Sequence, residues 1–141
     1  MEQLSRAIER TADEIKPIVQ TAAVTATSLL KKRIINEGFG RKYRSRSYIE
    51  LRKSKNLQVN FVNLSFSGRM FKGLNVSGSF REGNKVFGYV AGTDDETKYK
   101  LRENKKRFPE FTNLSEQENE IIIDQYLTPK IIEIFNKNLG L

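Results

Sequence analysis

The sequence has 141 residues, the usual size of a single domain, and a net charge of +8. It contains neither histidine nor cysteine. The absence of histidine excludes serine–histidine hydrolases, histidine-based nucleases and zincins, and the absence of cysteine excludes disulfides and thiolate metal sites. Because the longest apolar run is short, 121 to 123, we expect neither export nor membrane spanning.

Residues 2 to 36 have the periodicity of amphipathic helix, with an interruption at Pro17. Because proline fits the first turn of a helix, we predict a short helix over about 2 to 13 and a long one from about 15. Gly38 and Gly40 are expected to end the second helix. Small residues at 22 to 28 permit close packing, either on the protein's own core or on a second subunit. The apolar stripe consists of Ile15, Ile18, Val19, Ala22, Ala26, Leu29, Leu30 and Arg33.

Residues 31 to 55 carry ten positive charges against Glu37 and Glu50, a local balance of +8. Phe39, Tyr43 and Tyr48 are interleaved with these charges, a pattern typical of phosphate contact with base stacking. A solvated face and a docking patch for an acidic protein remain open as alternatives. We expect Ser47 to start a short helix, with Glu50 completing a capping box. The predicted contact residues are Lys31, Lys32, Arg41, Lys42, Arg44, Arg46, Arg52, Lys53 and Lys55; Arg33 completes the ten.

After Asn56 the periodicity changes from helical to alternating, which predicts an extended segment and then a β-hairpin. We expect the first strand to carry alternate apolar residues, a turn over 81 to 84, and a return strand over 85 to 91. Glycines 73, 78 and 88 indicate bulges or close backbone approach. The apolar positions of the extended segment and first strand are Leu57, Val59, Phe61, Leu64, Phe66, Met70, Leu74, Val76 and Phe80.

The last third of the chain predicts a charged surface helix over 95 to 106, a loop with two aromatic residues over 107 to 111, and a final amphipathic helix. The acidic run 94 to 96 is interpreted as helix capping, with a Mg²⁺ site as the alternative. Ser115 and Glu118 predict a capping box, Pro129 a kink, and Gly140 the helix end. Core packing is favoured over partner binding for this helix. The residues expected to be buried are Ile122, Ile123, Tyr126, Leu127, Ile131, Ile134 and Phe135.

The predicted fold class is therefore α+β, in one domain over 1–141, with two N-terminal helices, a small antiparallel sheet built on a β-hairpin, and a C-terminal amphipathic helix. Residues 31–56 form its basic loop, and whether that loop is ordered alone stays open. Neither a phosphate-binding loop nor a dinucleotide fingerprint is present.

Two short motifs resemble the tailed-phage virion morphogenesis family, whose tail-completion or neck proteins include the minor tail protein Z group. The first motif is Leu64, Ser67, Gly68 and Met70, preceded at similar spacing by Tyr43, Ser45, Tyr48 and Arg52. The second is Arg107 and Phe108, followed by a Leu-Ser pair at 114 and 115. The order of the elements is similar over nearly the whole chain.

This resemblance implies a structural virion protein of the neck or tail end, made in the bacterial cytoplasm, with no catalysis, cofactor, metal or membrane. Its expected partners are the tail terminator and the connector, its expected assembly is a homo-oligomeric ring, and the basic loop is expected to meet acidic neighbours or channel DNA. A stand-alone nucleic-acid-binding protein is the main alternative. A nuclease using Asp94, Asp95, Glu96 and a lysine is the third.

Overall fold

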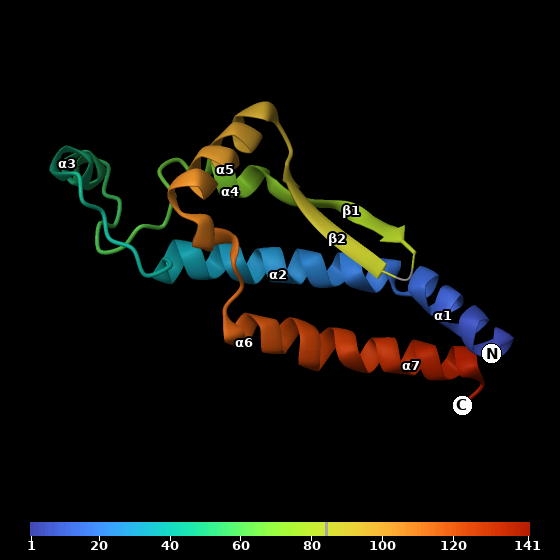
Figure 1. Ribbon diagram of the computed structural model, residues 1–141. Coiled ribbons are helices and arrows are strands. Elements are labelled where there is room, and N and C mark those ends of the chain that lie inside the picture. Colours follow the sequence, from blue (N-terminus) through green and yellow to red (C-terminus); the bar gives the residue numbers. More distant parts are fainter. Residues whose placement is uncertain (84) are drawn as a thin grey trace. The chain divides into compact units, whose positions relative to one another are not determined.

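The computed structural model describes residues 1–83 and 85–141, leaving out the side chains of Ser77, Phe80 and Tyr89. The chain is a mixture of helix and sheet, which confirms the predicted α+β class (Figure 1). The elements in chain order are α1 (Glu2–Glu14), α2 (Lys16–Glu37), α3 (Arg46–Ser54), α4 (Arg69–Gly73), β1 (Leu74–Glu82), β2 (Lys85–Gly92), α5 (Asp95–Arg107), the 3-10 helix η1 (Pro109–Thr112), α6 (Glu116–Asn119), the π-helix η2 (Glu120–Leu127) and α7 (Thr128–Leu139).

The chain divides into two compact units, each described below by itself. Unit 1 consists of Met1–Thr27, Asn75–Ala91 and Leu114–Leu141. Unit 2 consists of Ser28–Leu74 and Gly92–Asn113. No helix in the described part of the chain is both long enough and apolar enough to cross a membrane.

The two N-terminal helices form where the sequence predicts them. Pro17 stands in the first turn of α2, where a missing backbone N–H leaves no helical bond unmade. The helix ends at Glu37 because Gly38 adopts a left-handed backbone, φ +73°, from which its N–H donates to the carbonyl of Ile34 at 3.0 Å.

In unit 1, α1 packs beside α7 (Figure 1). Asn138 of α7 donates to the buried hydroxyl of Thr11 at 3.1 Å, and Lys137 pairs with Glu14 at 3.2 Å. The hairpin lies on the first half of α2, because a Cβ built on Gly88 would stand 3.0 Å from the Cβ of Ala23. The small residues of α2 therefore admit a strand of the protein's own hairpin, the core alternative predicted for them.

The hairpin itself is confirmed, but its first strand starts later than predicted. Met70 belongs to the short helix α4, and β1 begins only at Leu74. Gly68, with φ +74°, turns the chain into this helix, and residues 57 to 68 form neither strand nor helix. Of the predicted turn, Asn84 lies outside the described residues.

The C-terminal helix has the predicted capping box, since Ser115 and Glu118 each accept a hydrogen bond from the other's backbone N–H. Instead of a simple kink at Pro129, the turns before it widen into the π-helix η2. Proline lacks an N–H and crowds the carbonyl four residues earlier, so the regular α-helical hydrogen bond cannot form at this position. Ile122 is buried as predicted, whereas Ile123 is 48% exposed, so that prediction is wrong. Gly140 ends α7 in the left-handed conformation.

Unit 2 has a core formed by apolar side chains from the end of α2, the 57–68 segment, α4 and η1. Gly73 lies close against α5: a Cβ at Gly73 would fall 2.2 Å from the hydroxyl oxygen of Thr97. Glycine is thus required where α4 meets α5. The buried apolar residues of unit 2 are Leu30, Ile34, Val62, Met70, Phe71, Leu74 and Phe111.

Candidate functional site: a cationic pocket in unit 2

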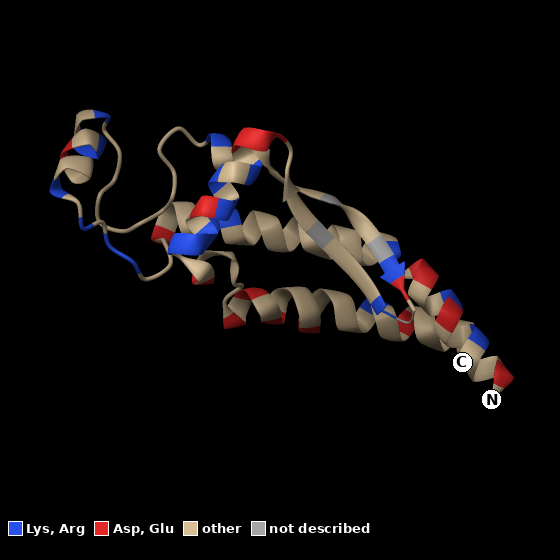
Figure 2. Ribbon diagram, turned by 45° about the horizontal axis from the view of Figure 1, so that its top comes forward, with Lys and Arg blue, Asp and Glu red and all other residues tan. Residues whose placement is uncertain are grey.

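The basic segment 31 to 55 is more ordered than a loop. Lys31 and Lys32 belong to the last turns of α2, residues 38 to 45 form a connection, and the remainder forms α3 (Figure 2). The cap of α3 is Ser45, whose hydroxyl accepts from the N–H of Tyr48 at 3.3 Å, so the predicted cap at Ser47 is wrong. The hydroxyl of Ser47 lies 3.1 Å from that of Ser45 instead, and Glu50 pairs with Arg46 rather than closing a capping box.

Positive charge is concentrated in unit 2 well beyond this segment. Unit 2 has 18 lysines and arginines against 7 aspartates and glutamates, a net charge of +11. Unit 1 has 7 against 10, a net charge of −3. Since α5 and α4 add cations of their own, the charged surface of unit 2 comes from several elements (Figure 2).

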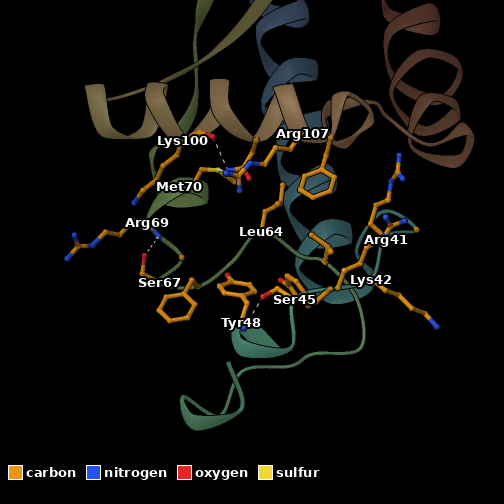
Figure 3. Close-up of a pocket in the computed structure, with 18 residues that line it drawn as sticks. Arg41, Lys42, Ser45, Tyr48, Leu64, Ser67, Arg69, Met70, Lys100 and Arg107 are labelled. Atoms are coloured by element: carbon orange, nitrogen blue, oxygen red, sulfur yellow. Dashed lines mark hydrogen bonds between the residues drawn. The ribbon is translucent and has the colours of Figure 1, made fainter. Parts of the chain in front are cut away.

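A pocket of about 950 Å³ lies within unit 2, lined by 18 residues (Figure 3). Six of them are cations, and none is an aspartate or glutamate. In Figure 3, Lys100 and Arg107 extend from α5 on one side and Tyr48 rises from α3 on the other, with Leu64 between them. The cations are Arg41, Lys42, Arg44, Arg69, Lys100 and Arg107.

The pocket brings together all six residues of the two sequence motifs. Leu64, Ser67, Gly68 and Met70 line it together with Arg107 and Phe108, although the motifs lie about 40 residues apart in the chain. Met70 is buried, and its sulfur accepts a hydrogen bond from the side-chain amide of Asn104 at 3.4 Å, which links α4 to α5. The motif residues therefore line one cavity.

The lining includes three polar residues that the sequence did not indicate as site residues: Arg69, Lys100 and Asn104. Arg69 stands between two motif positions, which was the available signal. Lys100 and Asn104 are one turn apart on a helix that sequence analysis assigned to the surface. Their common direction appears only when α5 packs on α4.

Helix α5 is oriented by its N-cap, Asp94, whose carboxylate accepts from the backbone N–H of Thr97 at 2.8 Å and from its hydroxyl at 3.0 Å. These bonds, the backbone one first, lower the pKa of Asp94. Glu96 pairs with Lys100, which lowers the pKa of Glu96. Asp94 therefore caps the helix, as predicted for the acidic run, and Glu96 forms an ion pair. No group of three or more metal-binding side chains occurs among the residues that the structure describes.

The loop after α2 is held against η1. Arg41 pairs with Glu110 at 2.6 Å, and the carbonyl of Arg41 accepts from the N–H of Val62 at 2.8 Å. The pKa of Glu110 is lowered, first by a hydrogen bond from its own backbone N–H and then by Arg41. Phe39 packs edge-on against Phe108 at 5.4 Å, so this predicted stacking residue is engaged inside the protein.

Arg52 was predicted to contact a partner or DNA, and the structure corrects this, because the side chain is only 1% exposed. Its guanidinium donates to the carbonyls of Gln58 and Ser65 at 2.9 and 3.0 Å and to the side-chain oxygen of Asn63 at 3.2 Å. It also lies 4.6 Å from the ring centre of Tyr43. Every branch of the guanidinium is used inside the chain, so Arg52 supports the wall of the pocket instead of binding a ligand.

Tyr43 completes this buried network. Its hydroxyl donates to the side-chain oxygen of Asn63 at 3.2 Å and accepts from the N–H of Asn63 at 3.3 Å. Burial raises the pKa of Tyr43, opposed by the Asn63 hydrogen bond and by the charge of Arg52. The hydroxyl therefore remains a donor at neutral pH.

Two aromatic rings at the pocket are partly exposed, although the guanidinium carbon of Arg52 lies 5.9 Å from the ring centre of Tyr48. Tyr48 is 36% exposed and Phe66 is 44% exposed, and the two rings are stacked with centroids 6.3 Å apart. The predicted role of Tyr48 in stacking is compatible with this exposure. Phe66 was predicted only as part of an extended segment.

The remaining predicted contacts lie outside the pocket. Arg46, Lys53 and Lys55 are exposed on α3 and just after it, and Lys32 is exposed on α2. Lys31 is partly buried, and this burial lowers its pKa.

Fold and site together define a small α+β protein with a pocket lined by cationic and aromatic side chains. Comparison with protein-family models, with curated proteins and with solved structures finds no match to this chain.

Proposed function

We propose that this protein is a non-catalytic assembly protein of the neck or tail end of a tailed-phage virion, which completes the tail or joins it to the head through subunit contacts. The observation that carries the proposal is the meeting of both motifs at one pocket. Residues 64 to 70 and 107 to 108 are the segments that resemble the virion morphogenesis family, and a shared pocket gives them a common reason to occur together.

The charge distribution supports the same proposal. In a ring of copies around a DNA channel, a weak electrostatic contact from each unit 2 is multiplied by the number of copies. The proteins expected to contact such a ring are the tail terminator and the connector. The protein then works by holding surfaces together, and turnover is not needed.

The test is genetic and structural. In a phage that encodes this chain, a nonsense mutation in its gene is expected to give complete heads and complete tails that fail to join, as seen by electron microscopy of the lysate. Wild-type protein supplied from a plasmid is expected to restore joining. The Lys53→Ala protein is expected to restore it equally well, because Lys53 lies outside the pocket. Normal joining without the protein would refute the proposal.

A second candidate function, a small nucleic-acid-binding protein, is favoured by one specific observation: six cations line the pocket without any carboxylate. Direct binding predicts micromolar or tighter affinity for DNA that falls steeply as salt rises. Fluorescence anisotropy of labelled DNA over a salt series measures this. Absence of binding at low salt would leave only the assembly function.

A further inference from the structure

We propose that the pocket of unit 2 binds an unpaired nucleic-acid strand, with the phosphates on its cations and a base on the exposed rings of Tyr48 and Phe66. The proposal rests on the nucleic-acid candidate above and is independent of the virion assignment. It specifies an unpaired strand as the form of nucleic acid and names the residues that distinguish this strand from a duplex.

The first step is the number of available cations. Arg41 pairs with Glu110, and Lys100 pairs with Glu96. Among the residues that the structure describes, Lys42, Arg44, Arg69 and Arg107 have no carboxylate within ion-pair distance. Four unpaired cations around one cavity without an acidic residue leave a positive potential that a polyanion satisfies.

The second step is the arrangement of these charges. In Figure 3, Arg69 and Lys42 lie on opposite sides of the group of lining residues, and their charged ends point away from each other. Arg107 lies between them, on α5. Cations spread across the lining in this way suit an extended chain of phosphates better than a single small anion.

The third step concerns the rings. Tyr48 and Phe66 line the same pocket and keep more than a third of their surfaces exposed. An aromatic face beside cations is the usual platform for an unpaired base, because every base has a flat π-face. A base in a duplex is stacked on its neighbours and is unavailable to such a ring. An acidic peptide would satisfy the cations, but its carboxylate side chains offer no aromatic face to the rings, so the observations favour the unpaired strand.

The backbone around the rings leaves room for a ligand. Gly40 and Gly68 both line the pocket, and a Cβ built on either would meet no atom within 4 Å. A cavity of about 950 Å³ is within the range of pockets that hold small organic ligands, and it is large enough for a nucleotide.

The test compares labelled DNA oligonucleotides with the same number of phosphates: a single strand, a duplex, and an abasic single strand. Wild-type protein is expected to bind the single strand at least about fivefold more tightly than the abasic strand, the lower end of what one stacked base contributes. Tyr48→Leu and Phe66→Leu are expected to lose this preference, whereas Tyr48→Phe keeps it. The abasic comparison uses unmodified protein, so the result does not depend on a variant that folds poorly.

The cations are tested by salt dependence. Arg107→Gln and Arg69→Gln are each expected to reduce the slope of log affinity against log salt by about 0.7, the value for one phosphate contact on a single strand. The matched control is the double variant Lys53→Gln, Lys55→Gln, which removes two exposed cations outside the pocket and is expected to change single-strand binding less than either pocket variant.

Other results overturn the proposal in distinguishable ways. Equal binding of single strand, duplex and abasic strand, with equal losses in pocket and control variants, would overturn the pocket while leaving general nucleic-acid binding intact. Absence of binding to any DNA at low salt would overturn both. Tighter binding of poly-glutamate than of the single strand, lost in Arg107→Gln, would identify the pocket as an acidic-peptide site.

Discussion

Arg52 is a cation close to the pocket that stabilises the protein's own fold. Its three hydrogen bonds reach residues 58, 63 and 65, which belong to a segment without helix or strand. The segment has few backbone hydrogen bonds of its own. The hydrogen bonds from the Arg52 guanidinium take the place of those that a neighbouring strand would provide. Position 64, a motif residue of the pocket, lies between two of these anchors.

Replacing Arg52 by lysine is expected to lower the free energy of unfolding by about 1–3 kcal/mol, because a single ammonium group reaches fewer of the three acceptors and leaves the others buried and unpaired. Urea unfolding followed by circular dichroism measures the change. The control is Lys53→Ala, the exposed neighbour, which is expected to stay within about 0.5 kcal/mol of wild type. Similar losses in both variants would show that Arg52 has no special structural role.

Tyr43 predicts a loss of stability in alkaline solution. Burial raises the pKa of its hydroxyl above the ordinary value of about 10, so the folded protein holds this proton to higher pH than the unfolded chain. The stabilising contribution is complete below pH 10 and declines as pH rises from there through the folded pKa. The difference in absorbance near 295 nm between wild type and Tyr43→Phe, followed against pH, isolates the titration, and a midpoint at or below 10 would contradict the prediction.

At the scale of elements, the hairpin depends on the absence of a side chain at one position. A Cβ at Gly88 would stand 3.0 Å from the Cβ of Ala23 and 3.2 Å from the carbonyl oxygen of Val19. Both atoms are fixed by the backbone of α2, so neither is free to move aside as the end of a long side chain would. The strand and the helix must separate if the contact is filled.

Gly88→Ala is accordingly expected to destabilise the protein by about 1–3 kcal/mol. Ala23→Gly removes the opposing methyl group and alone lowers stability by about 1 kcal/mol through helix propensity. The double variant is expected to lose at least about 0.5 kcal/mol less than the sum of the two single changes. Urea unfolding of wild type, the two single variants and the double variant gives the double-mutant cycle. Strict additivity of the two stability losses would argue against the contact.

At the scale of the molecule, like charges repel within unit 2, where the net charge of +11 exceeds that of the whole chain. The described ion pairs are mostly exposed and contribute little individually. Added salt should therefore weaken the repulsion between like charges by more than it weakens the ion pairs.

The free energy of unfolding in urea is expected to rise as sodium chloride increases from about 20 to about 200 mM, because the Debye length shortens. The double variant Lys53→Glu, Lys55→Glu has a lower net charge. Its free energy of unfolding is expected to rise less over the same range of salt. Falling stability with added salt would mean that ion pairs dominate.

Local patterns in the sequence determined the two N-terminal helices, the return strand and several caps. The breaks at Pro17 and Gly38, the Ser115–Glu118 box and the Asp94 cap all depend on residues within a few positions of one another. The exposure of each cation was decided only by tertiary structure. Arg52 and Lys53 are adjacent and similar in sequence, yet one is buried beneath Tyr43 and the other is exposed, because the path of residues 57 to 65 determines what covers them. The pocket depends on tertiary structure for the same reason, since α5 brings Lys100 and Arg107 to motif residues that no local pattern connects to them.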